Sequence, residues 1–174
     1  SHILEKKLKL TVNERKTHIA HSDEGVKFLG VVIGTNYIHV QEKKFNHFKA
    51  KVKRLTRRNS GKNLAMVLKE LNPVLRGTVN YFKIANISRK LTQLAGWIRR
   101  RLRRLQLKLW KKPKKLHRRL KQLGYKPPFK FMTMDSWKNA ASPLSNYAMP
   151  NQWFKEVGLY AIDEVKTGIL LPVR

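Results

Sequence analysis

Between residues 91 and 109 the chain repeats large apolar residues at spacings of three and four, with basic residues between them. That period matches one face of an α-helix, so the segment is expected to fold as a long amphipathic helix. Such a helix requires neighbours, because its apolar face must be buried against other elements. The apolar stripe consists of Leu91, Leu94, Ile98, Leu102, Leu105 and Leu109.

Shorter segments with the same apolar period precede and follow this helix. One begins near Gln41, and the next is expected to stop at Asn72, because Pro73 lacks the amide hydrogen that a helix interior needs. Pro73 then opens a further helix at its first position, and Ser88 is expected to cap the long helix. A last short helix should end at Gly124, where glycine can adopt the left-handed conformation of a helix C-terminus.

The first 40 residues follow a β pattern instead. Alternation from Leu8 to Val12 predicts one strand, and the apolar run Val26–Ile33 predicts a second. Tyr37–Val40 predicts a third strand, which forms a hairpin with the second across Gly34–Thr35–Asn36. Three short strands cannot enclose a full core, so they are expected to form the edge of a larger sheet or a small remnant of one.

A second change of composition follows the helices. Tyr125–Pro128 reads as a linker, after which basic residues thin out and aromatic residues supply a small core, with Asn151 as the cap of a short helix. The sequence therefore predicts a mainly α chain in three parts. These are a β segment at 1–40, a basic helical bundle at 41–124 and a small helical module at 125–174.

Most of the charge lies in the helical part. The chain carries 39 Lys and Arg against 10 Asp and Glu, a net charge of +29, although 41% of its residues are hydrophobic. Glu70 is the only acid between residues 43 and 134. Like charges on neighbouring helical turns repel, so such a surface is typical of proteins that neutralise a polyanion. Nucleic acid ranks ahead of a membrane surface, because the apolar stripe is needed to hold the helices together.

Several function classes are disfavoured. Cysteine is absent, which excludes disulfides, thiol catalysis and Cys-ligated zinc. No apolar run approaches the roughly 20 residues that span a bilayer. The acids are scattered as Asp23–Glu24, Asp135 and Asp163–Glu164, and His18 and His21 are expected at the surface, so no metal site is predicted. We therefore expect no catalytic residue, no metal, no cofactor and no small-molecule substrate in this chain, and no membrane partner.

Several strings, in unbroken order, resemble one family. Two N-terminal strings, Leu10–Thr17 and Val26–Ile33, are similar to the last palm segments of a reverse transcriptase. The strings Leu71–Gly77, Val79–Phe82 and Trp97–Arg103 follow in the order found in the maturase-specific domain. The chain thus resembles the C-terminal part of a group II intron-encoded reverse transcriptase, or maturase, whose maturase-specific domain is also its thumb.

The resemblance implies a palm edge at 1–40, a thumb at 41–124 and a DNA-binding-like region at 125–174. It implies that the protein binds group II intron RNA, stabilises the folded form for splicing, and supports reverse transcription and retrohoming as part of a larger protein, in a bacterial cytoplasm or an organelle. Target DNA is a second implied partner, bound through the C-terminal module. The Tyr-Ala-Asp-Asp polymerase motif lies upstream of Leu8 in that family, so this fragment is not expected to be an enzyme. Its parent is then an RNA-directed DNA polymerase, with Mg²⁺ acting in the missing polymerase site and in the RNA.

The candidate site residues combine the basic helices with the family strings. Whether Tyr81 and Trp97 stack on unpaired bases or belong to the core stays open. Phe28, Leu29 and Gly30 match the primer-gripping strand of the resembled family. Two alternatives to a maturase fragment are a ribosomal-type RNA-binding protein and the thumb subunit of a split reverse transcriptase. The expected RNA contacts are Lys49, Lys53, Arg54, Arg57, Arg58, Arg76, Asn80, Tyr81, Arg99, Arg100, Arg101, Arg103, Arg104, Lys108, Lys111, Lys112, Arg118 and Arg119.

Overall fold

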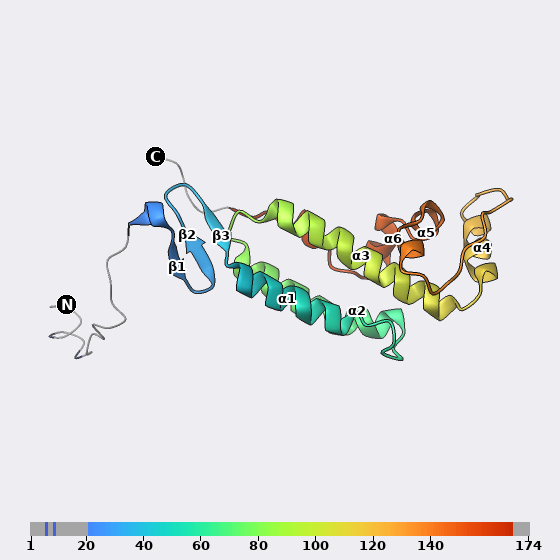
Figure 1. Cartoon of the computed structure of the whole chain (residues 1–174), viewed down its shortest axis with the longest axis horizontal. Coiled ribbons are helices and arrows are strands. Elements are labelled where there is room, and N and C mark those ends of the chain that lie inside the picture. The colour runs from blue at the N-terminus through green and yellow to red at the C-terminus, as the bar shows by residue number, and fades with distance from the viewer. Residues whose placement is uncertain (1–5, 7–8, 10–20, 169–174) are drawn as a thin grey trace.

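The computed structural model describes residue 6, residue 9 and residues 21–168. Several expectations fall outside these residues, namely the strand with Leu8 and Val12, the string Leu10–Thr17 and the side chain of His18. Within them, the prediction of a mainly helical chain with a short N-terminal β segment is confirmed (Figure 1). The elements are η2 Ser22–Glu24, β1 Val26–Phe28, β2 Val31–Ile33, β3 Ile38–Val40, α1 Glu42–Leu55, α2 Leu64–Phe82, α3 Ser88–Trp110, α4 Pro113–Gln122, η3 Lys138–Ala141, α5 Pro143–Ala148, α6 Asn151–Glu156 and η4 Ile162–Glu164.

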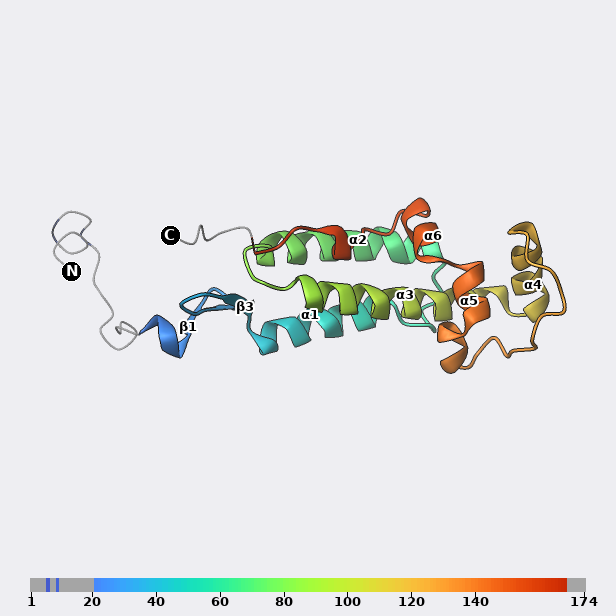
Figure 2. The same ribbon diagram turned by 90° about the horizontal axis from the view of Figure 1, so that it is seen from above.

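Helices α1, α2 and α3 run side by side along the long axis of the molecule, as Figures 1 and 2 show. The sheet lies at one end of these helices, and α4 crosses the end of α3 at the other. After α6 the chain returns along the helices toward the sheet, where the Gly168 amide donates to the Lys83 carbonyl at 2.9 Å. Segments from both ends of the described chain therefore meet beside the sheet.

The core lies between the three long helices and follows the predicted stripe. Five of its six members on α3, from Leu91 to Leu105, are at most 3% exposed, whereas Leu109 is only half-buried. Each fully buried leucine or isoleucine contributes about 1.5–3 kcal/mol, so this stripe is the main source of helix packing. The facing buried residues are Phe48 and Val52 of α1 and Val67, Leu68, Leu71, Leu75, Val79 and Phe82 of α2.

The break expected at Pro73 is wrong. Helix α2 is continuous from Leu64 to Phe82, with Pro73 in its interior. The helix continues because its apolar stripe runs through the proline in register: Leu71 and Leu75 are both completely buried and lie four residues apart. Burial on both sides of Pro73 outweighs the roughly 3 kcal/mol that an interior proline costs.

The single strand expected over Val26–Ile33 is also wrong. It is divided into β1 and β2, which pair antiparallel with Phe28 opposite Val31. The residues between them, Leu29 and Gly30, have φ angles of 44° and 85°, as a two-residue hairpin turn requires. Such turns usually carry Asn-Gly, so the sequence Leu29–Gly30 did not indicate a turn. The hairpin expected between the last two strands is confirmed, because β2 pairs antiparallel with β3.

Several hydrogen bonds attach the sheet to the helical part of the chain. The Tyr81 hydroxyl of α2 donates to the Leu29 carbonyl at 2.7 Å, and the Gln41 amide donates to the Gly30 carbonyl at 3.0 Å. On the other side of the sheet, the Asn86 amide donates to a β3 carbonyl at 2.6 Å. The β1–β2 turn is therefore held by groups of the helical part, although Leu29 itself is 68% exposed.

Removing the Tyr81 hydroxyl should weaken this attachment. We expect Tyr81→Phe to lower the free energy of unfolding by about 0.5–1 kcal/mol, the usual contribution of one hydrogen bond. Tyr147 supplies a matched control, because it is similarly exposed and its hydroxyl makes no hydrogen bond within the described part of the chain. Urea unfolding of Tyr81→Phe and Tyr147→Phe measures both, and equal losses would contradict the role assigned to Tyr81.

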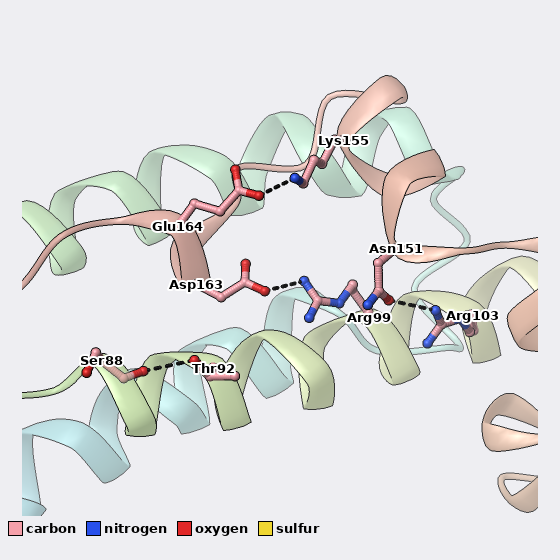
Figure 3. Close-up of polar contacts among 8 residues, drawn as sticks. All are labelled: Ser88, Thr92, Arg99, Arg103, Asn151, Lys155, Asp163 and Glu164. Carbon is pink, nitrogen blue, oxygen red and sulfur yellow. Dashed lines mark hydrogen bonds and ion pairs between the residues drawn. The ribbon is translucent and has the colours of Figure 1, made fainter.

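Two expected helix caps are wrong. Ser88 is the first residue of α3 rather than its cap, which is Ile87 without a side-chain bond, and the Ser88 carbonyl accepts from the Thr92 hydroxyl at 3.1 Å (Figure 3). Asn151 is likewise the first residue of α6. Its side-chain oxygen accepts from Arg103 at 3.1 Å, so Asn151 fastens α6 to α3 instead of capping its own helix.

Candidate nucleic-acid interface

Helix α3 presents three different lines of side chains. The leucine stripe faces α1 and α2. A second line, spaced by four residues, consists of Ala95, Arg99, Arg103 and Leu107, and faces the C-terminal segment. A third line runs beside α1 and toward the loop that ends at Trp137, and it consists of Trp97, Arg100, Arg101, Arg104 and Lys108.

The second line takes two expected RNA contacts away from the surface (Figure 3). Arg99 forms a 2.9 Å ion pair with Asp163, and the two side chains are 11% and 21% exposed. Arg103 is 7% exposed, and its Nε donates to the Met149 carbonyl at 2.9 Å. Burial, followed by repulsion from Arg99, lowers the pKa of Arg103 to about 10. Arg103 is therefore a structural residue that holds the C-terminal segment on α3.

The third line forms one wall of a groove against α1. A hollow of about 380 Å³ lies between the two helices and is lined by Asn46, Lys49, Ala50, Lys53, Trp97 and Arg101. Trp97 is half-buried at its floor. The Lys49 ammonium lies 5.5 Å from the centre of its ring, and the Arg101 guanidinium lies 5.0 Å away. Both distances suit cation–π contacts, so an aromatic face and two cations share one open depression.

Arg101 also ties α1 to α3. Its Nε donates to the Thr56 hydroxyl at 2.6 Å, and its Nη2 donates to the carbonyls of Lys53 and Thr56 at 3.0 and 3.2 Å. These acceptors lie at the C-terminus of α1, where the helix dipole favours a cation. Burial, with a smaller contribution from Arg104, lowers the pKa of Arg101. Arg101 thus shapes the groove and leaves only part of its guanidinium for a ligand.

Trp137 packs against arginines of α3 that adjoin the groove. The guanidinium carbons of Arg100 and Arg104 lie 5.1 and 4.9 Å from its ring centre, and that of Arg101 lies 5.9 Å away. Arg58 donates from Nη1 to the Asp135 carbonyl at 2.6 Å, two residues before the tryptophan. Sequence reasoning assigned Trp137 to a small aromatic core and did not foresee this contact, because nothing in the local sequence shows that the loop folds back onto α3.

A second hollow adjoins this loop and has a volume of about 410 Å³. Its basic side chains are Arg58, Lys108 and Lys111, and the exposed Asp135 is its one acid. Lys108 also donates to the Asn59 side chain at 2.6 Å. Two separate basic hollows therefore lie along α3, one at Trp97 and one near the C-terminal end of the helix.

Most remaining candidates lie on exposed surface. Lys49, Lys53, Arg54, Arg57, Lys111, Lys112 and Arg118 are exposed, whereas Arg119 is half-buried. The three candidates on α2 lie outside the groove. Arg76 lies over the Tyr160 ring at 5.2 Å, Tyr81 binds the β1–β2 turn, and Asn80 is exposed. In that turn Phe28 is 57% exposed, whereas Gly30 is buried.

Asp163, Glu164 and Asp23 each contact a different partner. Asp163 pairs with Arg99 and Glu164 with Lys155 (Figure 3). Asp23 accepts from the Thr35 hydroxyl. Among the residues that the structure describes, no three side chains of His, Asp or Glu gather as metal ligands would.

No helix within the described residues combines the length and the apolar character that a bilayer span requires.

The structure thus combines a helical bundle with a basic groove that holds an aromatic side chain. Residues 45–124 match the family described as the group II intron, maturase-specific domain. The match runs from the first turn of α1 to Gly124, which has a φ of 89° and ends α4 as the sequence predicted. This match covers 80 of the 174 residues and supports a role of the chain in group II intron splicing. No curated protein matches the sequence.

Proposed function

We propose that this chain binds group II intron RNA in the groove between α1 and α3 and stabilises the folded RNA for splicing. The observation that carries the proposal is the groove itself, which lies within the maturase-specific domain and combines Lys49, Lys53 and Arg101 with the Trp97 ring. Cations neutralise phosphates and release counterions, and the Trp97 ring holds two of these cations in the groove. The RNA performs the chemistry, and the protein supplies charge and shape.

The placement of the charges supports structured RNA as the ligand rather than non-specific electrostatic binding of any polyanion. No ion pair among the described residues neutralises a groove cation, since the four that exist involve Lys62, Lys90, Arg99 and Lys155. Uncompensated like charges beside one another weaken the folded state. A polyanion that follows the groove removes that cost, and the RNA would therefore also stabilise the protein.

We further propose that the chain acts as the thumb of a larger reverse transcriptase and supports reverse transcription and retrohoming there, in a bacterial cytoplasm or an organelle. The family match to 45–124 and the exposed turn with Phe28 and Leu29 beside α2 support this arrangement. Target DNA is the partner proposed for the C-terminal module. The family match argues against the ribosomal-type alternative. A separate thumb subunit would have the same groove.

Removing charge from the groove should change how RNA binding depends on salt. Lys49 and Lys53 line the groove, and Arg54 is exposed next to Lys53 on α1, at a neighbouring hollow. We expect the triple variant Lys49→Gln, Lys53→Gln, Arg54→Gln to bind a transcribed group II intron about ten-fold more weakly. The slope of log K against log salt should fall by roughly 2, because each lost phosphate contact lowers it by about 0.7–0.9. Filter binding over a series of KCl concentrations measures both quantities.

A triple variant with the same charge provides the control. Lys69, Lys83 and Lys126 are exposed and lie outside the groove, so their replacement by Gln should leave the slope close to that of the unmodified chain. If both triple variants lose the same affinity and slope, total charge rather than the groove binds RNA and the proposal fails.

A further inference from the structure

Three guanidinium groups beside the loop 131–137 have unused donor capacity. The Nε atoms of Arg58, Arg100 and Arg104 are buried and have no hydrogen-bond partner among the described residues. No carboxylate of that part of the chain forms an ion pair with them. Buried polar groups in folded proteins are normally paired, so these arginines carry donor capacity that the described residues leave unused. We call these three residues the arginine cluster.

The arginine cluster is also an accumulation of positive charge. Arg100 and Arg104 share the Trp137 ring at 5.1 and 4.9 Å. Burial and, after it, repulsion from Arg58 lower the pKa of Arg104. An indole ring attracts a cation through its face but accepts no hydrogen bond at the guanidinium edge. Stacking therefore orients the arginines and leaves their terminal nitrogens available, since all three side chains are only half-buried.

We propose that the arginine cluster is a phosphate-binding site that takes one phosphodiester of bound RNA and thereby locks the loop 131–137 onto α3. This inference rests on the proposed function, because it assigns a part of the bound RNA to a site beside the groove. A phosphate presents several acceptor oxygens, and the planar guanidinium fork matches two of them at once. The same arginines hold Trp137 and, through Arg58, the Asp135 carbonyl. A phosphate that fixes the arginines therefore also fixes the loop.

Asp135 is the acid nearest to this proposed site. Its side chain lines the adjoining hollow with Arg58, Lys108 and Lys111 and forms no ion pair within the described chain. A carboxylate there repels an incoming phosphate and therefore limits its affinity. Asp135→Asn should for that reason strengthen phosphate binding about two- to five-fold, a change that a purely structural role of the loop would not produce.

Two probes test the site, namely inorganic pyrophosphate and a transcribed group II intron. The variant is Arg100→Gln with Arg104→Gln, and its control, Lys114→Gln with Lys115→Gln, removes the same charge from exposed positions of α4. We expect pyrophosphate to raise the melting temperature of the unmodified chain and of the control, and to raise that of the cluster variant by less than half as much. RNA should slow hydrogen exchange of residues 131–137 several-fold, except in the cluster variant.

The outcomes separate the two proposals. If the cluster variant responds to pyrophosphate and RNA like its control, the phosphate site is wrong, and RNA binding by the unmodified chain still upholds the proposed function. If pyrophosphate acts at the cluster but no intron RNA binds, the proposed function fails and the anion site stands. If Gln prevents folding, Arg100→Lys with Arg104→Lys keeps the charge and removes the fork. This variant should lose at least half of the pyrophosphate response, and a full response would overturn the site.

Discussion

Replacing Arg103 by alanine is expected to lower the free energy of unfolding by about 3 kcal/mol. The same replacement at Arg104, the next residue, should cost much less stability and should weaken RNA binding. The side chain of Arg103 is buried and donates to Met149 and Asn151. Alanine removes both donors and leaves the Met149 carbonyl, whose residue is completely buried, without a partner.

The loss is expected to be partly recovered by a longer apolar side chain. Arg103→Met keeps most of the volume that packs on the Phe154 ring, which lies 5.2 Å from the guanidinium. It also avoids burying a cation, a cost seen in the lowered pKa of Arg103. We therefore expect Arg103→Met to be destabilised by about 1–2 kcal/mol, since the unpaired carbonyl remains.

Chemical denaturation and RNA binding, measured on the same three variants, separate the roles. At a temperature where all variants are folded, both Arg103 variants should bind intron RNA with nearly the affinity of the unmodified chain. Arg104→Ala should bind several-fold more weakly. An Arg103→Ala protein with normal stability and weak RNA binding would return Arg103 to the RNA-contacting set and contradict its structural assignment.

The contrast between these neighbours shows what the sequence could predict of the site. The leucine stripe from Leu91 to Leu105 was predictable, because helical periodicity directly reports which face is buried. The sorting of the basic residues was not, because Arg99 and Arg104 look alike until the C-terminal segment is placed. One signal was available: Ala95 and Leu107 continue the Arg99–Arg103 line at spacings of four. Two small or apolar residues on that line indicate a second covered face.

Sequence patterns were also insufficient to predict the local conformation of the sheet. The β character of Val26–Ile33 was predictable from its composition, but the turn within it was not, because Leu29 occupies a left-handed position that Asn or Gly usually holds. The Tyr81 hydroxyl bonds the carbonyl of that leucine. Contacts from residues far along the chain therefore decide local conformations that propensity alone disfavours.

Pro73 also adopts a local conformation that its propensity disfavours. Its replacement is expected to stabilise the protein, whereas replacement of Arg103 is expected to destabilise it. Replacing Pro73 by alanine is expected to raise the free energy of unfolding by about 1–2 kcal/mol. The gain has two sources, because alanine restores an interior backbone hydrogen bond of α2 and removes the clash of the proline ring with the preceding turn. It is smaller than the roughly 3 kcal/mol propensity difference, since the unfolded chain with alanine also gains conformational freedom.

The position is suited to this test because Pro73 is exposed, so its ring contributes little packing. Its neighbour Asn72 supplies the control. The Asn72 side chain donates to the Gly158 carbonyl at 2.7 Å and accepts from the Tyr160 amide at 3.0 Å. Asn72→Ala should therefore destabilise the protein by about 1–2 kcal/mol. Guanidinium denaturation should move the two midpoints in opposite directions. A lower midpoint for Pro73→Ala would contradict this prediction, because it would show that Pro73 stabilises α2.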